Sequence, residues 1–224
     1  MSFLIFILIY LCKEYVCMSR IKDAFDAVAD AIIAQKDYLS DIDAKAGDGD
    51  HGLNMARGFR AAKEALDDMD DTTQIAPVLK KIGKSLIQNV GGAAGPLYGA
   101  AFVKASEACD EETRMNIASF EKLLAAAITA IQERGRAEQG DKTILDALIP
   151  IHDCFLPENV EDKNLFEVLQ EASKAAGDGV NYTKEIPAKK GRASLVGERS
   201  IGVEDPGAVS TMLMYRALYQ FLKR

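Results

Sequence analysis

The sequence has few cysteines and no excess of basic charge. Its 224 residues include four cysteines, and no two have the C-x-x-C spacing typical of structural zinc sites. Four are also too few for a disulfide scaffold of this length, so a reducing cytoplasm is the expected location. Lys and Arg number 27 against 34 Asp and Glu, a net charge of −7. This balance argues against nucleic acid or an anionic membrane as the main partner, because both require clustered basic charge.

The N-terminal apolar run is too short to span a bilayer. It extends from Phe3 to Cys12, ten residues, whereas a membrane-spanning helix needs about 20. The segment also lacks the basic start and small-residue cleavage site of a secretory signal. At Met18 the chain starts again as MSRIKDAF. We therefore interpret residues 1–17 as an apolar extension outside the fold and residues 18–224 as one domain; a membrane-proximal anchor is the alternative for the extension.

From Ser19 onward the hydrophobic pattern is helical. Ile21, Phe25, Val28 and Ile32 recur at the spacing of a helix that turns one face to a core. Asp205 and Pro206 have the N-cap and first-turn order that opens a last helix. Connections are short, and no convincing strand is present, so the sequence predicts an all-α, up-and-down antiparallel bundle. The eight predicted helices are a first one along the Ile21–Ile32 stripe, then 55–66, 74–90, 96–109, 119–134, 143–155, 164–185 and 206–224.

Three glycine-rich segments interrupt the helices, at 41–52, 90–99 and 188–207. Glycine permits positive φ and close approach of the backbone to a ligand, and loops of this kind commonly carry function. The 90–99 segment could admit a ligand against its backbone, with Pro96 in the first turn of the next helix. A tight turn between two helices explains it equally well.

Three carboxylates in the first of these segments form a candidate metal site. Asp43, Asp48 and Asp50 lie within eight residues, among glycines that can fold their side chains toward one point. Mg²⁺ prefers a few carboxylate oxygens and completes its shell with water and substrate phosphates. An EF-hand is a poor alternative: with Asp41 as its first ligand, Ala46 and Gly52 occupy the positions of its turn glycine and its bidentate acid. A solvated acidic turn is the alternative.

Two nucleotide-binding patterns are accidental matches. Gly47, Gly49 and Gly52 satisfy G-x-G-x-x-G, but a helix rather than a strand precedes them, and aspartates between them would repel a bare pyrophosphate. The GKS triplet at 83–85 resembles the end of a Walker A loop. Val78 stands where that loop requires its first glycine, so the triplet is interpreted as part of a helix.

Histidine and arginine supply the remaining candidates. His51 starts a predicted helix, where unpaired N–H groups and the positive dipole end favour phosphate oxygens; a surface histidine that caps the turn is the alternative. His152, in an apolar stretch, is interpreted as structural. Arg192 and Arg199 are candidates for phosphate, although an exposed arginine that pairs with Glu198 is equally ordinary.

In this order and at these separations, four stretches resemble the nucleotide-binding L subunit of dihydroxyacetone kinase, the DhaL type. They are DAKAGDGDHGLNMARGF, GGAAGPLYGAAF, GRAEQGDKTILDAL and GRASLVGERSIGVEDPGAVS. The similarity runs from Met18 to the C-terminus. It implies an eight-helix up-and-down barrel that holds a nucleotide and two Mg²⁺ ions at one end.

The resemblance also implies individual roles. The family's metal ligands correspond to Asp43, Asp48 and Asp50, and no catalytic side chain is assigned. Ala94 stands where serine is usual and Ile144 where methionine is usual, so a hydroxyl contact to phosphate is lost while an apolar wall for the base is kept. The nucleotide contacts correspond to His51, Gly52, Leu53, Asn54, Ala93, Ala94, Gly135, Ile144, Arg192, Asp205, Pro206 and Gly207.

In the family, the L subunit transfers a phosphoryl group to dihydroxyacetone held by a separate K subunit. The expected cofactors are therefore ADP or ATP with Mg²⁺, and the expected partners are a K subunit and a phosphohistidine protein of the phosphotransferase system that rephosphorylates bound ADP. Direct use of exchangeable ATP, or a non-catalytic role as a nucleotide-binding regulator, are the alternatives. The resemblance leaves room for a homodimer.

Overall fold

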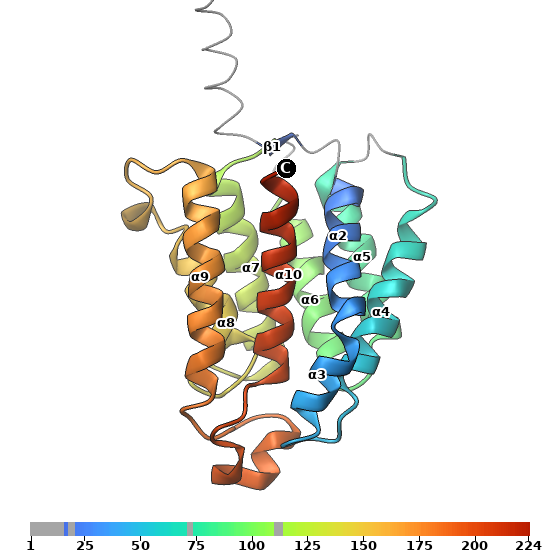
Figure 1. Cartoon of the computed structure of the whole chain (residues 1–224). Helices are drawn as coiled ribbons and strands as arrows, with labels where there is room; N and C mark the ends of the chain where they lie inside the picture. Colours follow the sequence, from blue (N-terminus) through green and yellow to red (C-terminus); the bar gives the residue numbers. More distant parts are fainter. Residues whose placement is uncertain (1–15, 18–20, 71–73, 110–113) are drawn as a thin grey trace, which may run out of the picture.

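The computed structural model describes residues 16–17, 21–70, 74–109 and 114–224. Over these residues the chain is mostly helical, which confirms the all-α class (Figure 1). The α-helices are α2 (Ile21–Ala34), α3 (Lys36–Asp43), α4 (His51–Leu66), α5 (Ile75–Asn89), α6 (Ala94–Glu107), α7 (Ile117–Gly135), α8 (Leu145–Asp153), α9 (Leu165–Thr183) and α10 (Pro206–Leu222).

Eight of these helices pack side by side in a closed cycle. Each helix of the ring contacts the following one, in the order α2, α4, α5, α6, α7, α8, α9 and α10, and α10 contacts α2 to close the ring. Their long axes run up and down (Figure 1), so α4, α6, α8 and α10 all begin at the same end of the molecule.

The helix α3 was not predicted and makes the count nine within the described chain. It follows α2 after a single turn residue, Gln35, and packs against α4 and α10 outside the ring. Only Leu39 and Ile42 of its eight residues are buried, which is too weak a pattern to separate a short helix from a loop. The acidic loop is correspondingly shorter than predicted and covers residues 44–50.

Capping side chains fix several helix starts. The Asn116 side chain accepts a hydrogen bond from the backbone N–H of Ser119 at 2.8 Å, so α7 begins before Ser119, the predicted start. Asn164 and Glu167 form a capping box at α9. At α10 the predicted cap is confirmed, because the Asp205 carboxylate accepts from the N–H of Ala208 at 2.7 Å, and Pro206 follows as the first helical residue.

The core fills the ring. Phe25, Phe59 and Phe102 make stacked and edge contacts at centroid distances of 5.8 and 6.4 Å, and Phe120 stacks on Phe155 at 5.5 Å. Between the helices the interior keeps an apolar cavity of about 250 Å³. This cavity shares Ile131 and Ile144 with the larger cavity at the end of the ring described below.

The GKS triplet at 83–85 lies inside α5, as predicted. Its glycine is required by packing: a Cβ on Gly83 would lie 2.7 Å from the Gly99 carbonyl oxygen and 2.8 Å from Val103 on α6. The two helices therefore cross at closely approaching glycines, and no phosphate loop is formed there.

Two short strands were not predicted. Val16–Cys17 (β1) pairs antiparallel with Arg114–Met115 (β2), with Val16 opposite Met115. Residues 1–15 lie outside the described part of the chain, so the interpretation of residues 1–17 as an extension stays a prediction. None of the described helices combines the length and apolar character needed to cross a membrane.

Candidate functional site

A cavity of about 690 Å³ lies at the end of the ring where α4, α6, α8 and α10 begin. Helix N-termini present unpaired backbone N–H groups and the positive end of the helix dipole, both favourable to anions. Four of them around one cavity make this end of the molecule a suitable place for a polyphosphate.

The three predicted metal ligands meet at the wall of this cavity. One carboxylate oxygen from each of Asp43, Asp48 and Asp50 lies within 4.8 Å of the others. Asp50 precedes α4 but makes no capping hydrogen bond, so its oxygens are not used by the helix. Three hard oxygen ligands at this spacing, on a half-buried turn, fit a divalent cation such as Mg²⁺.

The electrostatics of Asp43 agree with a cation site. Burial raises the pKa of its carboxyl, and the charges of Asp48 and Asp50 raise it further; hydrogen bonds from the backbone N–H groups of His51 and Gly49 act in the opposite direction. The His51 N–H lies 3.2 Å from the Asp43 carboxylate. A bound cation would relieve both the burial cost and the repulsion.

Glycine is needed in this turn for two reasons. A Cβ on Gly47 would collide with the Asp43 carboxylate, and Gly49 has φ +76°, a conformation that other residues rarely adopt. The sequence analysis inferred that glycines fold the acids toward one point, and the turn has this geometry.

His51 is not a surface histidine. Its Nε2 lies 3.1 Å from the Ser210 hydroxyl, and burial lowers its pKa to about 4 despite a hydrogen bond to the Pro206 carbonyl. Ser210 in turn contacts the hydroxyl of Tyr98 at 2.8 Å. The imidazole is therefore neutral at pH 7 and joins the start of α4 to the start of α10.

The glycine-rich connection before α6 also lines the cavity. Gly92 has φ +65°, and a Cβ on Gly91 would lie 2.6 Å from the Asn54 side-chain oxygen. Ala93 and Ala94 line the cavity at the first turn of α6. The segment is a tight connection between α5 and α6 and also lines the cavity, so both interpretations of it agree with its position.

The late loop covers the cavity with a 3₁₀ segment, Arg192–Ser200 (η3), kinked at Gly197. Arg192 forms an ion pair with Asp48 across the mouth of the cavity. Arg199, the other predicted phosphate ligand, is exposed and does not line the cavity. Its exposure agrees with the alternative of an ordinary surface arginine.

Apart from Gly52 and Leu53, every residue assigned from the family resemblance lines this cavity. Gly52 faces α3, where a Cβ would collide with the Lys36 carbonyl oxygen, and the Leu53 side chain is 55% exposed. A contact between a nucleotide in this cavity and Gly52 or Leu53 would therefore have to use the backbone. His152, interpreted as structural, lies elsewhere, 3.2 Å from the Glu121 carboxylate.

Lys142 was not predicted as a site residue, but it also lines the cavity although only 2% of it is exposed. It lies inside the GRAEQGDKTILDAL stretch, but a single lysine before a helix is usually solvated, and nothing in the local pattern indicates burial.

Comparisons with known proteins agree with this geometry. A protein-family model described as the DAK2 domain matches residues 45–220. The ADP-binding subunit DhaL of PEP-dependent dihydroxyacetone kinase 1 from Listeria innocua is 40% identical, over 83% of this chain and 87% of that protein. The corresponding subunit from Escherichia coli is 36% identical over 84% and 90%. An L-erythrulose 1-kinase from Mycolicibacterium smegmatis is 35% identical, but this chain covers only 32% of it.

Solved structures show the same fold. The dihydroxyacetone kinase of C. freundii in its native form superposes with a TM-score of 0.69 at 25% identity, over 89% of this chain and 34% of that one. The same kinase in complex with AMP-PNP and Mg²⁺ gives a TM-score of 0.67 at 24% identity. The chain thus belongs to the DAK2 domain family, among the DhaL-type subunits of dihydroxyacetone kinases.

Proposed function

We propose that the protein is the Mg²⁺- and nucleotide-binding subunit of a dihydroxyacetone kinase. The observation that carries the proposal is the meeting of three carboxylates and four helix N-termini at one cavity. Each half of this arrangement binds poorly alone, because carboxylates repel a polyphosphate and N-termini do not hold a cation. Together they suit a nucleotide whose phosphates are neutralised by metal.

In this proposal Asp43, Asp48 and Asp50 hold two Mg²⁺ ions, which, when bound, neutralise charge on the phosphoryl group in transfer. The Arg192 guanidinium, whose planar fork suits phosphate oxygens, exchanges its contact with Asp48 for one with the nucleotide. The N–H groups at Ala93 and Ala94 face the remaining phosphate oxygens, and the positive end of the α10 dipole at Pro206–Gly207 lies at the same cavity. Ile144 and Leu97 form an apolar wall for the base.

The acceptor and the donor are proposed to come from partner proteins. Four DhaL subunits named for PEP- or PTS-dependent kinases match this chain over nearly their whole length, whereas the chain spans about a third of the C. freundii kinase. We therefore propose a K subunit that presents dihydroxyacetone at the mouth of the cavity. A phosphotransferase-system protein is the proposed donor that rephosphorylates bound ADP.

Native mass spectrometry tests the binding part directly. The purified chain with ADP and Mg²⁺ should gain the mass of one ADP and two Mg²⁺, whereas an unchanged mass at saturating concentrations would contradict the proposal. Asp43→Asn removes a ligand charge while it keeps the side-chain shape, and should lose the Mg²⁺-dependent gain by at least about tenfold in affinity. Asp153→Asn, on an exposed turn at the end of α8, is the matched control.

A second assay separates the possible donors. Phosphoryl uptake by the ADP-loaded protein from a phosphoenolpyruvate-driven relay, followed by transfer to dihydroxyacetone with a K subunit, is the expected result. Turnover with ATP alone would indicate an exchangeable nucleotide instead. Absence of turnover with either donor would leave a nucleotide-binding regulator.

A further inference from the structure

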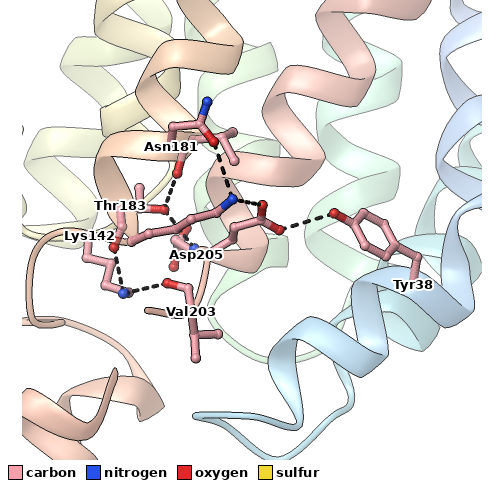
Figure 2. Close-up of polar contacts among 9 residues, drawn as sticks. Tyr38, Lys142, Asn181, Thr183, Val203 and Asp205 are labelled. Atoms are coloured by element: carbon pink, nitrogen blue, oxygen red, sulfur yellow. Dashed lines mark hydrogen bonds and ion pairs between the residues drawn. The ribbon is translucent and has the colours of Figure 1, made fainter. Parts of the chain in front are cut away.

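Lys142 is a buried lysine whose ammonium group donates to four backbone carbonyl groups. Its Nζ donates to the carbonyl oxygens of Thr183 and Val203 at 2.6 and 2.7 Å (Figure 2). It also donates to the carbonyl oxygens of Ser200 at 2.7 Å and Ile186 at 3.2 Å. The residue has φ +61°, in the left-handed region, which is uncommon for a side chain of this size. This backbone conformation is maintained where the surrounding contacts require it.

The four carbonyl groups come from the two ends of one loop. Thr183 and Ile186 lie where α9 ends and the loop starts, and Ser200 and Val203 lie where the loop returns to α10. They are 41 to 61 residues from Lys142 in sequence. The ammonium thus ties both ends of the 184–205 segment to each other and to the connection between α7 and α8.

All hydrogen-bond donors of the Lys142 ammonium group are occupied in this role. An ammonium has three protons, and four carbonyl oxygens already lie within hydrogen-bonding distance, so no proton is left for a phosphate at the nearby cavity. Burial lowers the pKa of Lys142, while the carboxylates of Asp205 and Asp146 oppose the change. A neutral amine would have one donor fewer, so the carbonyl cage favours the charged form.

The same base of the loop carries the cap of α10. The Thr183 hydroxyl accepts from the Asp205 N–H at 3.0 Å, and the Gly202 N–H donates to the Lys184 carbonyl at 2.8 Å. On its outer side Glu204 pairs with Lys184 at 2.7 Å and accepts from Tyr38 of α3 at 3.1 Å (Figure 2). Displacement of the loop base would therefore displace both Asp205 and Arg192.

We propose that Lys142 is a positioning residue, and that its ammonium in the carbonyl cage holds the 184–205 segment where Arg192 and the start of α10 face a bound nucleotide. The identity of that ligand rests on the proposed function. The contact of Lys142 with the 184–205 segment involves only the loop and its base, so this part of the proposal can be tested without ligand.

The first test is hydrogen exchange of the protein without nucleotide. Lys142→Met keeps most of the buried stem but cannot donate to the carbonyl groups. We expect faster exchange of the amides of residues 184–205 and little change in α4 and α5. Lys189→Met removes the same charge from an exposed side chain of the same loop, whose Nζ lies 3.4 Å from Asp141, and should leave exchange at the loop base unchanged.

The second test is chemical rescue. Lys142→Ala removes the atoms of a propylammonium ion. This variant should bind Mg²⁺-ADP more weakly by about 10- to 100-fold, the usual loss when a group that orients a ligand contact is removed. Added propylammonium should restore affinity to Lys142→Ala but not to Lys142→Met, whose side chain fills the space.

Unchanged exchange in Lys142→Met, or wild-type affinity in both variants, would overturn the proposal. Failure of both variants to fold, judged by far-UV circular dichroism, would also overturn it in favour of a general structural role. If the wild-type protein itself does not bind Mg²⁺-ADP, the proposed function fails, while the exchange result still decides whether Lys142 clamps the loop.

Discussion

At the scale of single residues, burial and charge compete at the carboxylates of the cavity. Burial raises the pKa of Asp43, and it raises that of Asp205 to about 7 even though Asp205 accepts hydrogen bonds as the cap of α10. A hydrogen bond from a backbone N–H favours the ionised form, so at Asp205 the desolvation effect is the larger one. Both acids lie where a cation or a closed loop would change their surroundings.

The pKa of Asp205 predicts a pH dependence of stability. Because its folded pKa exceeds the value of 3.8 expected when unfolded, folding takes up a proton between these values, and stability falls as the pH rises from about 4 to about 7. Asp205→Asn keeps a good N-cap oxygen for the Ala208 N–H and removes the titration. Urea unfolding across this range should show wild-type stability falling relative to the variant.

The difference in free energy of unfolding between wild type and Asp205→Asn isolates the effect of Asp205, because every other acid titrates in both proteins. A constant difference across the range, or one that grows in favour of wild type as the pH rises, would contradict the prediction. The absolute change at the cap should stay within about 1 kcal/mol at low pH, since asparagine and aspartate are comparable caps.

Single residues were predictable where local spacing carries the signal. Asp43, Asp48 and Asp50 share one short glycine-rich turn, so their meeting follows from the chain itself. Lys142 was not predictable, because its partners are four backbone carbonyl groups on a distant loop. Arg192 and Arg199 could not be separated, since the position of Arg192 at the cavity depends on its ion pair with Asp48, far away in the sequence.

At the scale of elements, the start of α4 depends on its contact with α3. A Cβ on Gly52 would collide with the Lys36 carbonyl oxygen and lie 2.8 Å from the backbone nitrogen of Ser40. Gly52→Ala should therefore force the two helices apart and lower stability by about 1–3 kcal/mol, the range for overpacking. Thermal or urea unfolding without nucleotide measures this effect.

Gly177→Ala provides the matched control in the middle of α9. There the new Cβ would lie 2.7 Å from the Arg216 guanidinium, the far end of a flexible side chain that can move away. Alanine also favours a helix interior by about 1 kcal/mol over glycine. Gly177→Ala should leave stability unchanged or slightly higher, and an equal loss in both variants would refute the role of the α3–α4 contact.

Elements were predictable in proportion to their length and periodicity. The helices that carry long apolar stripes were found with small errors at their ends, because caps such as Asn116 act a few residues before the stripe. The helix α3 and the strands β1 and β2 were missed, since each is stabilised by contacts with distant parts of the chain rather than by its own pattern.

At the scale of the whole molecule, the cavity joins the two ends of the domain. Asp43 and Asp50 lie near its start, Pro206 and Gly207 open its last helix, and α10 packs on α2 to close the ring. A ligand that contacts both sides can bind only the closed ring, so binding should stabilise the entire fold rather than one loop.

The expected stabilisation is measurable. At a hundredfold excess over its dissociation constant, Mg²⁺-ADP should add about 2.7 kcal/mol, which for a domain of this size raises Tm by about 5–10 °C. EDTA should abolish the shift, as should Asp43→Asn.

The control is Phe59→Ala, which truncates a fully buried core residue of α4. It should lower Tm, because about 3–5 kcal/mol of stability is lost. It should keep the ligand-induced shift, because Phe59 does not line the cavity. Differential scanning fluorimetry of wild type, Asp43→Asn and Phe59→Ala measures the Tm shift caused by Mg²⁺-ADP. A shift that survives EDTA, or a shift seen in wild type but lost in Phe59→Ala, would mean that ligand and metal do not act through the closed ring.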